Sequence, residues 1–125
     1  MEYTLKEEII DKLNQISESI EIIQQRRKGF QTVDDCLQSM IGMTILDACI
    51  LRIQVIGETI KSIDDKTKGN LFCLYPEIPW KKIIGLRNII SHEYANIDEA
   101  IIWVVITQHL FPLSTTIDRI KTDLS

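Results

Sequence analysis

Four neighbouring side chains are the best suited to chemistry in this chain: Arg87, His92, Glu93 and Tyr94. Histidine titrates near neutral pH, so it can take a proton from a ribose 2′-hydroxyl or return one to the leaving 5′-oxygen. An arginine fork can hold a phosphate group and stabilise the charge of its transition state. A tyrosine hydroxyl can orient the phosphate or be modified itself. These residue types allow phosphodiester cleavage without a metal ion.

The same side chains also have a purely structural interpretation. Arg87 would then be buried in an ion pair with Glu93 or Glu58, and His92 would cap the C-terminal end of a helix. An ideal helix turns 100° per residue, so Arg87 and His92 lie about 140° apart around its axis. We expect them to converge on one site only if the helix ends near His92 or a second subunit supplies the other half.

The elements that must position these residues are helices. Apolar residues recur at three- and four-residue steps, no segment alternates with a period of two, and capping patterns begin at Thr4, Thr32 and Asn96. The sequence predicts an all-α antiparallel bundle of about four to five helices, forming one domain over residues 1–125. We expect helices over about residues 5–28, 33–63, 80–90 and 97–124, the last kinked or interrupted at Pro112.

The charge balance excludes one class of function. The chain of 125 residues has 14 Lys and Arg against 18 Asp and Glu, a net charge of −4, which argues against sequence-blind coating of DNA by a broad basic face. A small basic pocket for RNA remains compatible with this charge, because local potential matters more than the total. An apolar fraction of 45% and a charged fraction of 26% are typical of a globular domain.

The cysteines and the N-terminal region bear on the compartment. Cys36, Cys49 and Cys73 show no Cys-x-x-Cys spacing, which fits reduced thiols in a cytosolic protein. The N-terminal residues are acidic where a signal peptide is apolar, and no uninterrupted apolar run approaches 18 residues. We therefore expect a cytoplasmic protein that makes no membrane contact.

Several other residues have weaker patterns. His109 lies in an apolar segment without acidic or thiol neighbours, so we interpret it as structural, and its spacing from His92 does not resemble a zinc site. Gly57 lies in the middle of a predicted helix and indicates a close approach of two helices. Lys81 and Lys82 lie shortly before the motif and could extend a positive patch around it.

At these residues the chain resembles a known family. Arg87-x4-His92-x-Tyr94 is similar to the R-x4-H-x-Y motif of HepT-type toxins, a branch of the HEPN superfamily also catalogued as DUF86. The resemblance extends from the first helix to Leu113. The flanking segments that share it are Ile56-Gly-Glu58, Pro76-x-x-Pro-Trp80, Arg87-Asn88, Ile97-Asp98 and Trp103.

This resemblance implies a function. HEPN ribonucleases are all-α and generally dimeric, and they cut RNA without a metal ion or cofactor where the motifs of two subunits meet. Arg87 and His92 would be the catalytic pair, acting on tRNA or mRNA in a homodimer. Glu58, Lys81, Lys82 and Asn88 would support the site or contact RNA.

The resemblance also implies a partner. HepT toxins are encoded beside a small nucleotidyltransferase antitoxin of the MntA type, as in type VII-like toxin–antitoxin systems. In characterised pairs the antitoxin adds AMP to the motif tyrosine, which is Tyr94 in this chain. A bulky anionic adduct two residues from His92 would fill the cleft and repel RNA phosphates.

Three hypotheses follow. The chain is a toxin ribonuclease, or a non-catalytic binding subunit that docks on a nucleotidyltransferase, or a structural helical dimer in which Arg87 and His92 only satisfy buried polar groups. The complete motif favours the ribonuclease. The binding subunit predicts tight partner binding that survives His92→Ala. The structural dimer predicts that substitution costs about 1–3 kcal/mol of stability and nothing else.

Overall fold

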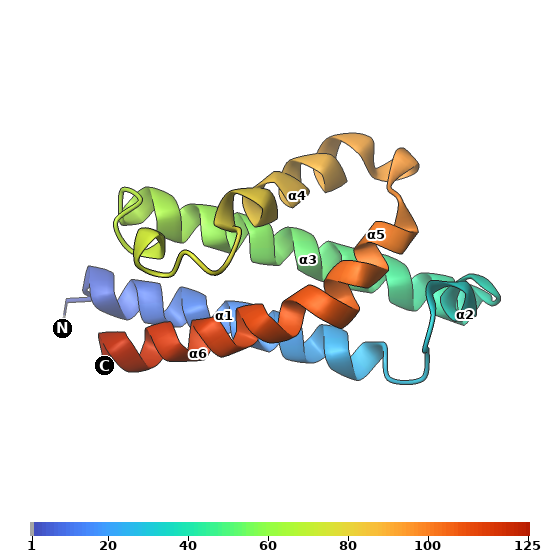
Figure 1. Cartoon of the computed structure of the whole chain (residues 1–125), viewed down its shortest axis with the longest axis horizontal. Coiled ribbons are helices and arrows are strands. Elements are labelled where there is room, and N and C mark those ends of the chain that lie inside the picture. Colours follow the sequence, from blue (N-terminus) through green and yellow to red (C-terminus); the bar gives the residue numbers. More distant parts are fainter. Residues whose placement is uncertain (1) are drawn as a thin grey trace.

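The computed structural model describes residues Glu2–Ser125, which form helices joined by short connections and contain no strand (Figure 1). The long helices α1, α3 and α6 run lengthwise, and α4 lies across one side of α3 (Figure 1). The predicted all-α bundle is confirmed. The α-helices are α1 Leu5–Arg26, α2 Val33–Leu37, α3 Met40–Lys66, α4 Trp80–Glu93, α5 Glu99–Val104 and α6 Leu110–Leu124.

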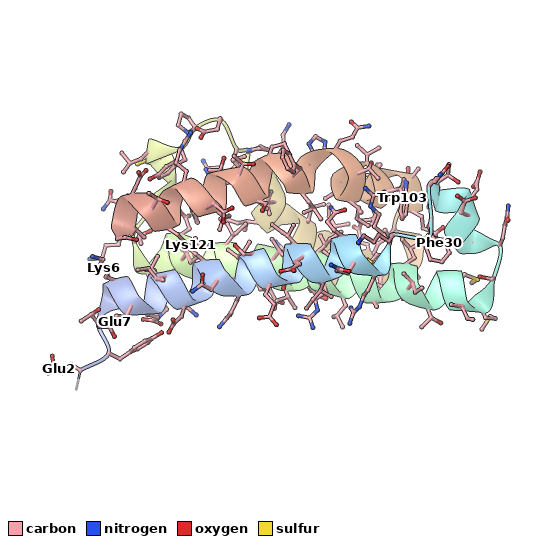
Figure 2. The ribbon with its side chains drawn as sticks, turned by 90° about the horizontal axis from the view of Figure 1, so that it is seen from below. Glu2, Lys6, Glu7, Phe30, Trp103 and Lys121 are labelled. Atoms are coloured by element: carbon pink, nitrogen blue, oxygen red, sulfur yellow. The ribbon has the colours of Figure 1, made fainter. Side chains whose placement is uncertain are left out.

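Helix α1 forms one wall of the bundle. The Thr4 side chain accepts a hydrogen bond from the Glu7 backbone N–H at 3.1 Å and caps the helix where the sequence predicts. The apolar stripe of α1 is buried, and its members are Ile9, Leu13, Ile16, Ile20 and Ile23. Figure 2 shows α6 alongside α1, where Lys121 donates to Asn14 Oδ1 at 3.3 Å and Ser17 Oγ at 3.1 Å.

The prediction of one helix over residues 33–63 is wrong at its start, because the helix is interrupted between α2 and α3. The Ser39 side chain accepts from the Gly42 backbone N–H at 2.9 Å and caps α3. Helix α2 folds back onto this first turn so closely that a Cβ on Gly42 would collide with the carbonyl group of Cys36. The apolar periodicity continues through the break and therefore hides it.

The connection between α3 and α4 is irregular but well packed. Phe72, in a short 3-10 turn, stacks on Trp80 with ring centroids 4.0 Å apart. The Trp80 indole N–H donates to the Tyr75 carbonyl oxygen at 2.8 Å. Pro79 immediately precedes α4, as its fixed φ predicts. The start of α4 is thereby anchored in the core.

Helices α5 and α6 continue into one another as a bent rod (Figure 1). The N-cap of α5 is Asp98, whose side chain accepts from the Ala100 N–H at 3.0 Å, and the predicted cap at Asn96 is wrong. Pro112 has no N–H to donate to the preceding turn. The chain widens into a π-helical segment, Val105–His109, just before it. The irregularity predicted at Pro112 thus lies one turn earlier.

Helix α3 and the α5–α6 rod are long and apolar enough, by length and composition alone, to cross a membrane. Mean hydropathy over a window reveals this, whereas a search for uninterrupted apolar runs does not. In this fold some of their apolar side chains pack in the core of the bundle. Ile60 of α3 and Ile117 of α6 are fully buried, and both helices pack on α1. The core thus buries part of each helix, 39% of the apolar window in both cases, while Met40, Ile41 and Phe111 remain exposed.

Candidate active site

The motif lies in the second half of α4 and in the turn that follows. Helix α4 remains helical through Glu93, where φ −130° and ψ 27° end it, and Tyr94 opens a 3-10 turn over residues 94–96. The helix ends one residue after His92, which is too late to change the direction of Arg87 or His92. One chain therefore presents these two side chains about 140° apart around the axis.

Arg87 lies where α4 packs closely on α3. A Cβ built on Gly57 would lie 3.2 Å from the Cβ of Arg87 and 3.0 Å from the carbonyl oxygen of Ile83. Gly57 is buried, and the absence of a side chain there lets the two backbones approach. The close helix approach predicted at Gly57 is confirmed, and it places Arg87 half-buried against α3.

The Arg87 guanidinium has no protein partner among residues Glu2–Ser125. Its Nε is shielded from solvent and has no hydrogen-bond acceptor. Glu58 and Glu93 are both exposed, and neither forms an ion pair with it. The predicted internal ion pair of Arg87 is therefore wrong. Leaving a buried donor without a partner costs about 1–3 kcal/mol of folding stability, and more when the group is charged. A ligand that offered a hydrogen-bond acceptor to Arg87 would therefore be bound favourably.

His92 lies on the opposite, exposed part of α4. Positions 81, 88 and 92 fall within about 20° of one direction around the helix, so Lys81, Asn88 and His92 form one exposed row, which we call the α4 stripe. Gly85 lies within this row, and a Cβ added to it would meet nothing within 4 Å. The structure thus brings three of the predicted site residues together along α4.

Tyr94 is fixed to α3 by a hydrogen bond. Its hydroxyl donates to Asp47 Oδ1 at 2.7 Å. The hydrogen bond to this carboxylate, followed by partial burial and the charge of Asp47, raises the pKa of Tyr94 to about 12. The phenol therefore stays protonated at neutral pH. The Tyr94 side chain is 49% exposed, so it is held in place and remains accessible from solution.

A second hydrogen bond joins the same two helices. Gln54 Nε2 on α3 donates to Ser91 Oγ on α4 at 2.6 Å. Asp47 and Gln54 are seven residues apart and so lie on one face of α3. Neither residue was predicted to belong to the site. Their only signal is that they are polar positions two turns apart on one face of the helix.

Lys82 points away from the α4 stripe. It leaves α4 about 100° from Lys81 and lines a groove of about 550 Å³ between α4 and the α5–α6 rod. Leu86 and Leu113 form part of its walls, and His109 also lines it. Lys82 therefore lies outside the α4 stripe, although it lines a second hollow of about 480 Å³ together with Lys81 at the start of α4.

The thiols have different surroundings. Cys36 and Cys49 are buried, Cys73 is exposed, and none forms a disulfide. Burial raises the pKa of Cys49 and of Cys36. Within Glu2–Ser125, no three His, Cys, Asp or Glu side chains gather in the manner of a metal site.

The known proteins that this chain resembles carry ribonuclease names. The model of the family described as "Ribonuclease HepT-like" matches residues 16–120. A protein of Methanocaldococcus jannaschii named "Gamma-glutamylcyclotransferase and putative RNase" is 34% identical over 112 residues, covering 90% of this chain and 47% of that protein. The chain thus spans about half the length of this relative.

Two further relatives match along most of their length. A "Probable ribonuclease HepT" of Thermococcus cleftensis is 25% identical over 112 residues, covering 89% of this chain and 94% of the relative. A "Putative RNase" of Caldanaerobacter subterraneus is 25% identical over 108 residues, covering 86% and 89%. No solved structure gave a significant match.

Proposed function

The chain belongs to the HepT-like ribonuclease family, and we propose that it is a metal-independent RNA endonuclease and the toxin of a toxin–antitoxin pair. The observation that carries this proposal is Arg87, whose buried Nε has no hydrogen-bond partner in the described part of the chain. A planar, permanently charged fork is well matched to a phosphate group. Because Glu58 and Glu93 leave it unpaired, Arg87 is available to a phosphate of RNA.

The proposed reaction is attack of a ribose 2′-hydroxyl on the adjacent phosphorus. His92 takes the 2′-hydroxyl proton as the 2′-oxygen bonds to phosphorus. The bond from phosphorus to the 5′-oxygen breaks, and the protonated His92 gives the proton to that oxygen. The products are a 2′,3′-cyclic phosphate and a 5′-hydroxyl. Arg87 stabilises the additional negative charge on the phosphate oxygens in the transition state. tRNA and mRNA are the substrates we propose.

We propose that a second copy of the chain completes the site. Within one chain Arg87 and His92 point in directions about 140° apart, and a two-fold pairing of α4 helices would place Arg87 of one copy near His92 of the other. The surface of α4 supports this pairing. Ile89 is 47% exposed beside the α4 stripe, and the open space at Gly85 leaves room for a close helix. Two copies would also concentrate the positive charge of Arg87 in one groove.

We propose that the antitoxin is a nucleotidyltransferase of the MntA type and that it attaches AMP to Tyr94. The support from the fold is that the Tyr94 side chain is half exposed and its hydroxyl is fixed by Asp47. A phosphodiester at this position would bring negative charge next to the path of the RNA backbone.

The experiment expresses the full chain alone under tight induction and follows growth and total RNA. Wild type should arrest growth and cut RNA, and His92→Ala should do neither. His109→Ala is the matched control, because it removes the only other histidine, which lies in the groove beside α6. Purified wild-type protein should cut RNA equally well in the presence of EDTA.

A second set of variants tests Arg87. Arg87→Lys keeps the charge but loses the two-pronged geometry, so cleavage should fall about as far as in Arg87→Ala. If wild type and all variants are harmless and RNA remains intact, the ribonuclease proposal is wrong. A binding subunit that serves a nucleotidyltransferase then becomes the better interpretation.

A further inference from the structure

We propose that Asp47 is a positioning residue, which holds the end of α4, and with it His92, on α3 through the hydroxyl of Tyr94. This inference rests on the proposed ribonuclease function. It assigns a role to a residue outside the Arg87–Tyr94 motif, on a different helix and 40 residues before Arg87 in the sequence.

The geometry is a pair of hydrogen bonds that bracket His92. On its N-terminal side, Ser91 accepts from Gln54 at 2.6 Å, and on its C-terminal side, Tyr94 donates to Asp47 at 2.7 Å. Both partners lie on the same face of α3. The backbone of His92 is therefore fixed on both sides, while its ring is exposed and makes no hydrogen bond within the described part of the chain.

The end of α4 needs such a contact. The last carbonyl groups of a helix lack intrahelical partners, so the final turn frays unless it is held. Across residues 94–96 the Tyr94–Asp47 hydrogen bond is the one side-chain hydrogen bond in the described structure. His92 lies in the last turn of α4 and would lose its fixed position if that turn opened.

The contact also makes the site sensitive to the proposed modification. Transfer of AMP from a nucleoside triphosphate forms a bond between the Tyr94 oxygen and the α-phosphorus, breaks the bond to pyrophosphate and releases the hydroxyl proton. The modified oxygen carries no hydrogen and can no longer donate a hydrogen bond to Asp47. The phosphodiester also brings a second negative charge next to the carboxylate. Modification would therefore release the end of α4 as well as place a bulky anion beside His92.

The test measures steady-state RNA cleavage by the purified chain. Asp47→Ala should lower kcat by up to about tenfold, because losing a hydrogen bond to a charged group changes the equilibrium constant between the ordered and the frayed helix end by about that factor. KM should not rise, since removing an anion does not weaken the binding of phosphates. Asp47→Asn still offers an oxygen acceptor and should restore part of kcat.

The matched control is Asp11→Ala. Asp11 accepts a hydrogen bond from Tyr3, which reproduces the chemistry of the Asp47–Tyr94 pair on an exposed part of α1. Glu8 of α1 pairs with Lys66, so this region lies against the far end of α3, roughly 28 Å along the helix from Asp47 at 1.5 Å per residue. Asp11→Ala should leave kcat and KM unchanged.

Tyr94→Phe provides the second arm. It removes the hydroxyl without adding bulk, so it should lower kcat by about the same factor as Asp47→Ala, and the double variant should fall no further. Unchanged kcat in Tyr94→Phe, or an Asp47→Ala variant that alters only KM, would overturn the inference.

Failure of the ribonuclease proposal is distinguishable from failure of this contact. If wild type cuts no RNA, the proposed function fails, and amide hydrogen exchange in the same variants decides whether Asp47 holds the helix end. Faster exchange at His92 and Tyr94 in Asp47→Ala than in Asp11→Ala supports the contact. Equal exchange in the two variants refutes it.

Discussion

Gly57 of α3 lies directly against Arg87 of α4, and a Cβ at Gly57 would come within 3.2 Å of the Arg87 Cβ. The catalytic candidate is therefore placed by a contact between two backbones rather than by a polar partner. This explains how Arg87 can be half-buried and yet keep its guanidinium free of carboxylates in the described structure. The packing of the two helices holds the base of the side chain and leaves its tip unpaired.

Gly57→Ala should destabilise the fold and reduce RNA cleavage. Alanine gains about 1 kcal/mol of helix propensity over glycine, but moving α4 away from the added methyl group costs about 1–3 kcal/mol. Because the nearest atoms are the Ile83 carbonyl oxygen and the Arg87 Cβ, no flexible side-chain tip can yield. Chemical denaturation and a cleavage assay check both effects. A variant as stable and as active as wild type would contradict this view of the contact.

Gly85→Ala should have the opposite effect on a single chain. A Cβ at Gly85 meets nothing within 4 Å, so the substitution should stabilise the helix by up to about 1 kcal/mol. If a second copy packs on the α4 stripe, the added methyl group should also weaken the dimer. Denaturation together with sedimentation over a range of concentrations separates the two effects. A stabilised variant that dimerises like wild type would place the interface away from this face of α4.

The Tyr94–Asp47 pair predicts a pH dependence at alkaline pH. The pKa of Tyr94 is about 12 in the folded chain, against about 10 for an unperturbed tyrosine. The protonated phenol is thus favoured by folding, and its stabilising contribution is complete below pH 10 and is lost as the pH rises to 12. NMR of ¹³C-labelled tyrosine rings measures the titration. Asp47→Ala should bring the Tyr94 pKa back towards 10, and an unchanged titration would show that Asp47 is not its partner in solution.

The cysteines provide a probe of folding. Cys73 is exposed and should react rapidly with a thiol reagent in the native chain. Burial raises the pKa of Cys36 and Cys49 and disfavours their reactive thiolates, so they should react only in denaturant. A chromogenic thiol assay should therefore count one group before unfolding and three after it. The Cys73→Ser variant should show no rapid reaction, and any remaining rapid phase would mean that the core opens readily.

Much of the fold could be predicted from the sequence, because the spacing of apolar residues identifies the buried face of each helix. The α1 stripe from Ile9 to Ile23 and the start of α4 after Pro79 are observed where expected. The break at Ser39 could not be predicted in this way. The apolar pattern continues across it, and the requirement for glycine at Gly42 arises only from the tertiary contact with Cys36.

The site was predictable to the extent that it lies in one continuous segment. Arg87, His92 and Tyr94 stand out by type and spacing alone. The partners of that segment are less visible, because nothing in the sequence around Asp47 marks it as the acceptor for a hydroxyl 47 residues later. The expected pairing of Glu58 with Arg87 failed for the same reason, since sequence proximity to Gly57 does not fix the direction of a side chain.

The arrangement of the chain ends has a consequence for protein architecture. The N- and C-terminal helices start and finish at the same end of the bundle, whereas the turn after α4 lies towards the other end (Figure 1). A fluorescent reporter, a surface linker or a second enzyme joined at either terminus would therefore leave Tyr94 unobstructed. The bundle is suited to act as a module in a longer polypeptide, which accords with a relative whose name joins two activities in one protein.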